Sequence, residues 1–137
     1  MFRTSSILLL VVITVSCVGC VLAGRSVPAA DSSIFGDWTG ESICQARDSA
    51  CHDEKVVYHV KPGKQADMVT IDADRITDGK AVDMGALEFT YDKTAQTLVS
   101  ETSGHWLFKI NWNKMDGTLT LANGTLFRKI ALTKKVS

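Results

Sequence analysis

Three histidines, His52, His59 and His105, have the widest chemical repertoire in the sequence, since imidazole can act as a general base or as a metal ligand near neutral pH. His52 follows a cysteine, His59 falls on the polar side of an alternating segment, and His105 begins an aromatic one. No two of them have the spacing of a metal-binding pair. The pattern favours ordinary strand or loop histidines and predicts no metal site.

The acidic stretch from Asp72 to Asp83 is a candidate calcium-binding loop. An EF-hand loop needs glycine at its sixth position and glutamate at its twelfth. Counted from Asp72, these positions hold Thr77 and Asp83, so the motif fails, and only a looser surface calcium site stays open. The sequence also lacks a phosphate-binding loop, a dinucleotide fingerprint and a Gly-x-Ser-x-Gly motif. We therefore expect a protein without catalytic activity and without a cofactor.

Cys44 and Cys51 are the two cysteines that follow the N-terminal segment. In an oxidising compartment, an even pair at close spacing most simply forms a disulfide. The metal alternative would recruit His52, Asp53 and Glu54. Because these residues are consecutive, a strand would point them to alternating faces, away from a common ion. The spacing favours the disulfide.

Residues 1–23 have the pattern of an export signal. Arg3 is the only charge before residue 25, residues 7–15 are almost wholly apolar, and small residues precede a cut after Ala23. The loosest apolar span, 7–23, has 17 residues, whereas a membrane-spanning helix needs about 20, so a retained anchor is the weaker alternative. We expect a signal helix over 1–23, a flexible linker over 24–33 and one folded domain over 34–137, outside the cytoplasm.

Lipidation of Cys20 is the alternative to cleavage after Ala23. Val18-Gly19-Cys20 is similar to the end of a bacterial lipoprotein signal, although Cys17 stands where leucine is usual. Cleavage after Ala23 is the preferred interpretation. Lipidation of Cys20 would instead tether the domain to a membrane, and only in that case do we expect membrane contact.

The charges of the expected mature chain nearly cancel. Removing Arg3 with the leader leaves 14 of the 15 Lys and Arg residues, against 15 Asp and Glu. A near-neutral surface gives no electrostatic reason to bind nucleic acid.

The expected domain alternates apolar and polar residues with a period of two, broken by turn-forming residues. Eight strands are predicted, over residues 36–44, 54–61, 67–74, 85–91, 97–101, 105–113, 117–122 and 126–134. Residues 76–84 read as a long loop or a short helical turn. Closure of such a meander removes its exposed edges, so we expect an all-β, eight-stranded antiparallel up-and-down barrel.

Large aromatic side chains fall on the apolar faces of three predicted strands. They are the candidate ligand-binding residues Tyr58, Phe89, Trp106, Phe108 and Trp112. The alternative role for them is barrel core, because an eight-stranded barrel is only just wide enough to be filled by side chains or to hold one small ligand. Short strands and large residues favour a filled interior.

Arg128 sits in an otherwise apolar row of the last predicted strand, so it needs a partner. Gly36-Asp37-Trp38 opens the first predicted strand. Together these residues resemble the lipocalin and calycin pattern, in which a Gly-x-Trp lies near the start of a small barrel and a basic residue of the final strand lies over the tryptophan. The resemblance implies that Trp38 plugs one end of the barrel and that Arg128 stacks on it.

A second resemblance is to small periplasmic barrels that inhibit metalloproteases, which are also exported, disulfide-bonded and built around a Gly-x-Trp. It implies that the tail of residues 31–35 would enter a protease cleft.

The sequence thus predicts an exported, non-catalytic binding module for a small apolar molecule or for another secreted or envelope protein. A protease inhibitor acting through its tail and a structural cell-envelope protein are the alternatives.

Overall fold

The computed structural model describes residues 33–46 and 50–136. The expected signal helix, nearly all of the linker and Cys20 lie outside these residues. In the described part, no helix is long and apolar enough to cross a membrane.

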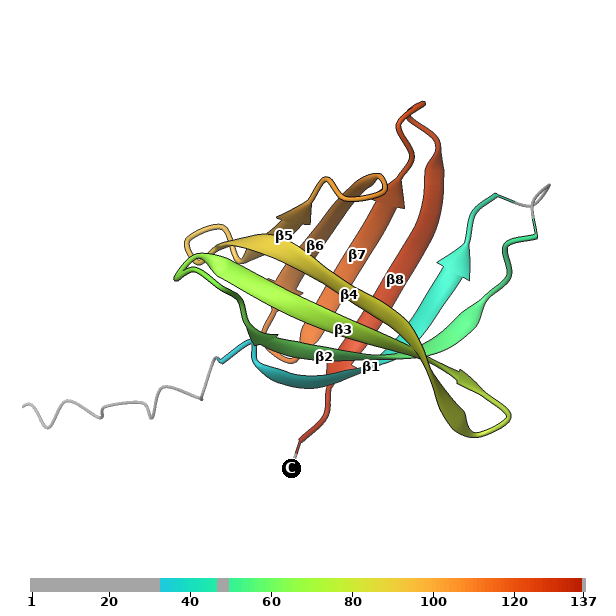
Figure 1. The fold of residues 1–137 in the computed structure, drawn as a ribbon, viewed down its shortest axis with the longest axis horizontal. Coiled ribbons are helices and arrows are strands. Elements are labelled where there is room, and N and C mark those ends of the chain that lie inside the picture. The colour runs from blue at the N-terminus through green and yellow to red at the C-terminus, as the bar shows by residue number, and fades with distance from the viewer. Residues whose placement is uncertain (1–32, 47–49, 137) are drawn as a thin grey trace, which may run out of the picture. The chain divides into compact units, whose positions relative to one another are not determined.

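Eight antiparallel strands form a closed barrel in which each strand pairs with the next and the last pairs with the first (Figure 1). The strands are β1 (Gly36–Cys44), β2 (Glu54–Pro62), β3 (Met68–Thr77), β4 (Lys80–Asp92), β5 (Thr97–Ser100), β6 (His105–Asn111), β7 (Lys114–Thr120) and β8 (Leu126–Lys134). The predicted all-β up-and-down barrel is confirmed, and β1 and β8 have the predicted bounds.

The barrel has two unlike ends. At the end called here the Trp38 end, β1 begins and β8 finishes, and Trp38 is fully buried beneath Ile34, whose carbonyl accepts a 2.8 Å hydrogen bond from the indole Nε1. At the opposite end, called the disulfide end, Cys44 and Cys51 close the connection between β1 and β2. Most of the core lies towards the Trp38 end, including the fully buried Leu98, Phe108 and Met115.

Residues 76–84 are neither a loop nor a helical turn, and that prediction is wrong. They form the outer part of the β3–β4 hairpin, which turns at Asp78 and Gly79, both at positive φ (51° and 75°). A register shift after Ala73 bends the hairpin away from the barrel (Figure 1). The alternation is missing there because both faces of the outer part of β4 are exposed, so burial does not select which residues are apolar.

Trp112 does not continue the aromatic row of β6, in contrast to the sequence prediction. The strand ends at Asn111, and Trp112 lies in the β6–β7 turn with φ 58° and 84% of its surface exposed. Alternation of faces holds only while the backbone is extended, so the left-handed turn residue is not directed to the interior.

Candidate functional site

A pocket of about 350 Å³ occupies the interior near the disulfide end. Four of the five predicted residues line it, namely Tyr58, Phe89, Trp106 and Phe108, whereas Trp112 does not. Its other lining residues are Ile71, Ala73, Met84, Gly85, Ala86, Leu87 and Ser103. The favoured interpretation of a filled interior therefore holds only towards the Trp38 end, because the interior is open towards the disulfide end.

Phe108 is the floor of this pocket and organises the other rings. It packs edge-on against Tyr58 and Phe89, with centroid separations of 6.1 and 5.6 Å, and stacks with Trp106 at 6.3 Å. Gly117 faces Phe108 across β6 and β7, and a Cβ there would come within 2.2 Å of the ring. The glycine thus leaves room for the Phe108 ring to lie flat on β7.

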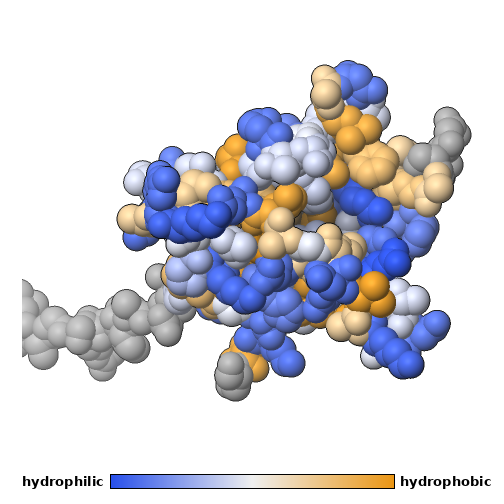
Figure 2. All heavy atoms as spheres, in the orientation of Figure 1, coloured by the Kyte–Doolittle hydropathy of each residue, from blue (hydrophilic) through white to orange (hydrophobic). Residues whose placement is uncertain are grey.

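The mouth of the pocket results from the unequal lengths of β4 and β5. β4 has 13 residues and β5 has four, and the two pair only from Thr90 to Asp92. Beyond Thr90, no described strand pairs with β4 on the β5 side, and there Met84 to Leu87 line the pocket opposite Ser103. Figure 2 shows apolar residues in the recess between two bands of polar ones on this face.

Tyr58 places the one phenol hydroxyl among the pocket's lining residues. Burial raises the pKa of Tyr58 to about 12, so the phenol is neutral near pH 7 and can both donate and accept a hydrogen bond. Among the residues that the structure describes, none makes a hydrogen bond with this hydroxyl. Arg128 and Glu54, at the disulfide end, act on this phenol electrostatically.

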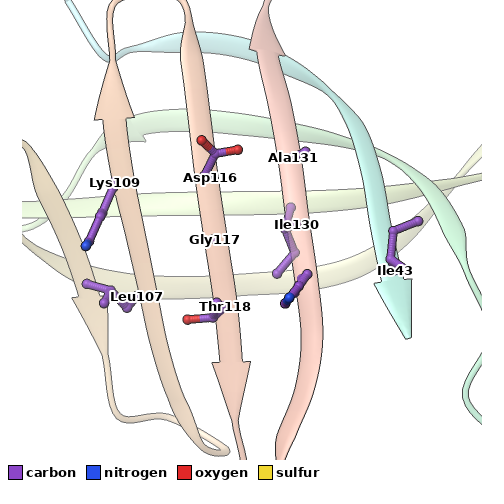
Figure 3. Close-up of a pocket in the computed structure, with 9 residues that line it drawn as sticks. Ile43, Leu107, Lys109, Asp116, Gly117, Thr118, Ile130 and Ala131 are labelled. Carbon is purple, nitrogen blue, oxygen red and sulfur yellow. The ribbon is translucent and has the colours of Figure 1, made fainter. Parts of the chain in front are cut away.

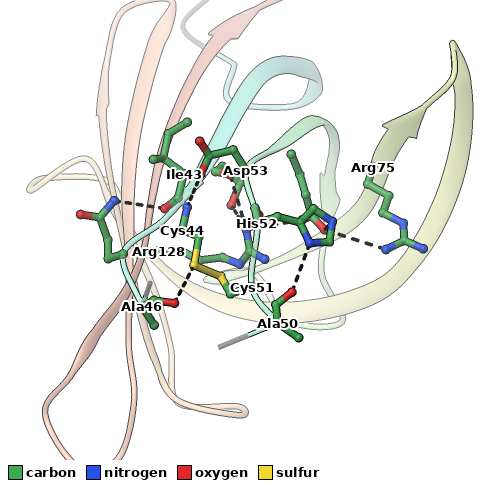
Figure 4. Close-up of polar contacts among 12 residues, drawn as sticks. Ile43, Cys44, Ala46, Ala50, Cys51, His52, Asp53, Arg75 and Arg128 are labelled. Carbon is green, nitrogen blue, oxygen red and sulfur yellow. Dashed lines mark hydrogen bonds and ion pairs between the residues drawn. A yellow bond between two sulfur atoms is a disulfide. The ribbon is translucent and has the colours of Figure 1, made fainter. Parts of the chain in front are cut away.

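Arg128 does not lie over Trp38, so that part of the sequence prediction is wrong. Its Nη1 donates to the Ser42 Oγ (3.1 Å) and the His52 carbonyl (3.3 Å), and pairs with the Glu54 carboxylate at 3.5 Å (Figure 4). The register of β1 and β8 explains the difference, because Arg128 pairs with Cys44, at the opposite end of β1 from Trp38. Arg128 is thus a partnered cation at the disulfide end.

Lys134 takes the position expected for Arg128. It is the register partner of Trp38, and its Nζ lies 5.9 Å from the centre of the indole ring. A basic residue of the last strand does contact the tryptophan, but it is the strand's final residue.

The predicted disulfide between Cys44 and Cys51 is confirmed, with the Cα atoms 5.8 Å apart (Figure 4). Asp53 supports this connection, because its carboxylate accepts a 2.9 Å hydrogen bond from the Cys44 amide. The pair fixes the loop that leads from β1 into β2 beside Arg128.

The three histidines have separate partners. His59 lies on the outer face between two carboxylates, 2.7 Å from Asp37 and 3.0 Å from Asp74. His105 contacts Glu101 at 2.6 Å, and His52 contacts the Ala50 carbonyl. Among the described residues, no three His, Cys, Asp or Glu side chains are grouped to hold a metal ion.

A second depression, of about 460 Å³, lies on the outer face of β6, β7, β8 and the end of β1 (Figure 3). Ile43 and Leu107 give it an apolar base, and Lys109, Asp116 and Lys129 border it. It lacks aromatic side chains, which line the interior pocket. The interior pocket is therefore the stronger candidate for binding a small molecule.

The expected inhibitory tail is described only from Ser33 onward. Ile34 is 3% exposed and belongs to the core, whereas Phe35 is 40% exposed. Asp31 and Ser32 lie outside the described residues. The last part of the tail is thus packed as part of the barrel.

No protein-family model matches this chain, and no curated protein matches it.

Proposed function

We propose that this chain is an exported, non-catalytic binding protein that holds a small, largely apolar molecule in the interior pocket. The observation that carries the proposal is the convergence of Phe89, Trp106 and Phe108 around an unfilled space that Tyr58 also lines. Ligand sites are mostly apolar concavities of about 300–1,000 Å³ with a few polar groups that orient the ligand. At about 350 Å³, the pocket suits a molecule at the small end of that range.

The barrel and its tryptophan support a calycin-like assignment. A closed, eight-stranded antiparallel barrel is compatible with that fold. The buried Trp38 and the ammonium of Lys134 over it supply the tryptophan–cation pair of the resemblance. A lipocalin-like role in binding is proposed on this basis.

Export is supported by the disulfide. Such a bond persists in oxidising compartments, which agrees with the proposed signal over residues 1–23. We place the protein in the periplasm or outside the cell, where partners would be small apolar molecules or secreted proteins rather than nucleic acid.

Tryptophan fluorescence tests the proposed ligand site. In a Trp112→Phe background the remaining indoles are Trp106, which lines the pocket, and Trp38, which is fully buried. Titration with a panel of fatty acids, fatty alcohols and hydrophobic dyes should shift or quench the Trp106 emission at saturation. No response across the panel would overturn the proposal.

Two alanine variants provide the matched control for that titration. Ala73→Leu adds apolar volume inside the pocket, whereas Ala131→Leu adds the same volume on the outer face. We expect Ala73→Leu to weaken binding by roughly tenfold or more, a typical effect for a blocked apolar site. If the two variants weaken binding equally, the binding site does not lie in the barrel interior.

A further inference from the structure

Exposed apolar side chains gather at the Trp38 end. Phe35, Trp112 and Val136 are 40%, 84% and 85% exposed, and they lie before β1, between β6 and β7, and after β8. The Lys134 amide donates to the Asn113 carbonyl, next to Trp112, and Lys135 donates to the Asp37 carbonyl near the start of β1, both at 2.8 Å. These backbone bonds join the start of β1, the β6–β7 turn and the end of β8, which are the segments next to the three apolar residues.

Trp112 is the least expected of the three. A bulky side chain at φ 58° is uncommon, since glycine or asparagine adopts this conformation at lower cost. The indole is 84% exposed and makes no ring contact or hydrogen bond within the described part of the chain. It adds nothing to the core, so its role is to be sought at the surface.

Lysines surround the same apolar residues. Lys114 begins β7 directly after the turn that holds Trp112, Lys134 ends β8, and Lys135 follows it. Asp37 is bonded into this surface through its backbone carbonyl, and its carboxylate contacts His59 at 2.7 Å. The exposed cations that accompany the indole are Lys114 and Lys135, because the half-buried Lys134 ammonium is engaged by Trp38 and the Ser33 carbonyl.

The chain from the N-terminal apolar segment enters the barrel at this end as well. Ser33, the first described residue, accepts a hydrogen bond from the Lys134 ammonium through its carbonyl. Residues 7–15 are apolar and precede Ser33 in the sequence. A leader attached to a membrane would therefore precede, in the sequence, the residues that enter the barrel at the Trp38 end.

We infer that the Trp38 end is a docking surface for an anionic lipid bilayer. Trp112, Phe35 and Val136 enter the interfacial layer, where tryptophan is enriched in membrane proteins. The exposed Lys114 and Lys135 interact with the negatively charged head groups. The pocket, at the opposite end, then faces away from the lipid and stays accessible.

Vesicle flotation tests this surface. The compact unit from Asp31 to Ser137 contains the whole barrel and its core, so it is the specimen that excludes the leader. It should float with vesicles of phosphatidylcholine mixed with phosphatidylglycerol, and much less with phosphatidylcholine alone or at high salt. Brominated lipids should quench Trp112, because Trp38 is fully buried and Trp106 lines the interior. No binding to the anionic vesicles would overturn the inference.

Substitutions separate this end from the rest of the surface. Trp112→Asn suits the left-handed backbone and removes the indole, and should weaken vesicle binding roughly tenfold, as expected for an aromatic side chain that is no longer buried. Lys135→Glu should weaken it on the order of fivefold or more. Val82→Asn and Lys80→Glu, on the exposed hairpin of β4, are the matched controls and should leave binding unchanged.

Two results would contradict the inference even if vesicles bind. Equal loss of binding in the control variants would assign binding to another surface. A dimer in sedimentation velocity that Trp112→Asn converts to a monomer would assign the surface to a second copy of the chain. Circular dichroism of each variant verifies that the barrel is intact.

Discussion

The ammonium of Lys134 lies 5.9 Å from the centre of the Trp38 ring, which joins the last residue of β8 to the buried tryptophan of β1. The two residues are register partners in the closing strand pair. The same ammonium bonds the Ser33 carbonyl. Lys134 therefore links the closure of the barrel to the segment that enters it.

The division of roles between Lys134 and Arg128 can be tested with two methionine substitutions. Lys134→Met should lower the free energy of unfolding by about 1 kcal/mol, the typical value of a cation–π contact. Arg128→Met should lower it by about 2 kcal/mol, because the largely buried Glu54 and Ser42 lose their partner. Urea unfolding measures both values. Near-UV circular dichroism should show a changed Trp38 band in Lys134→Met. A changed Trp38 band in Arg128→Met but not in Lys134→Met would contradict the structure.

Stability should fall between mildly acidic and mildly alkaline pH because of His59. Hydrogen bonds to Asp37 and then Asp74 raise the pKa of His59 in the folded state, since both ring nitrogens donate only in the imidazolium. Its contribution is complete below the unfolded-state pKa of about 6.5 and is lost as the pH rises through the higher folded-state pKa.

Urea midpoints measured over this pH range test the role of His59. His59→Gln should flatten this part of the pH dependence, and Asp74→Asn should reduce it. His105→Gln, which alters an exposed histidine paired with Glu101, is the matched control. An unchanged profile in His59→Gln would contradict the assignment.

Removal of the disulfide should destabilise the barrel without unfolding it completely. Cys44 and Cys51 are seven positions apart, and the chain-entropy relation for so short a loop gives about 2.5 kcal/mol. The double variant Cys44→Ala/Cys51→Ala should show this loss in urea unfolding. Intact mass of the non-reduced protein should be two hydrogens lower than that of the reduced protein, and a count of two free thiols would disprove the bond.

Gly117→Ala should disturb both the core and the pocket. The added Cβ would lie within 2.4 Å of two Phe108 ring carbons, so the ring must move. Overpacking of this kind costs typically 1–3 kcal/mol, and thermal unfolding should show the loss. Gly124→Ala cannot serve as a matched control, because Gly124 has φ 83° and an alanine would be strained there. Thr118→Ala, one residue away on the outer face, should have little effect.

The eight strands and four pocket residues could be predicted because each depends on a local pattern. Period-two alternation places Tyr58, Phe89, Trp106 and Phe108 on inward faces, whatever the detailed register. The disulfide could be predicted from cysteine count and spacing. The Asp78-Gly79 turn carried a usable signal as well, since Asp-Gly favours two-residue hairpins.

The remaining features depend on register and strand length, which alternation does not specify. The last-strand partner of Trp38 is Lys134 rather than Arg128 because the stagger between β1 and β8 decides it. The mouth of the pocket exists because β5 stops after four residues while β4 continues. Trp112 does not belong to its predicted row because the strand ends at Asn111, two residues before its predicted end.

The amino-acid sequence by itself determined the class of fold, the inward faces and the cysteine pair, since short-range spacing and side-chain burial specify them. Only the tertiary structure decided which residues meet across the barrel and where its interior stays open. The physical reason is that closure aligns strands distant in the chain, and that alignment sets both the Trp38–Lys134 contact and the unfilled space above Phe108.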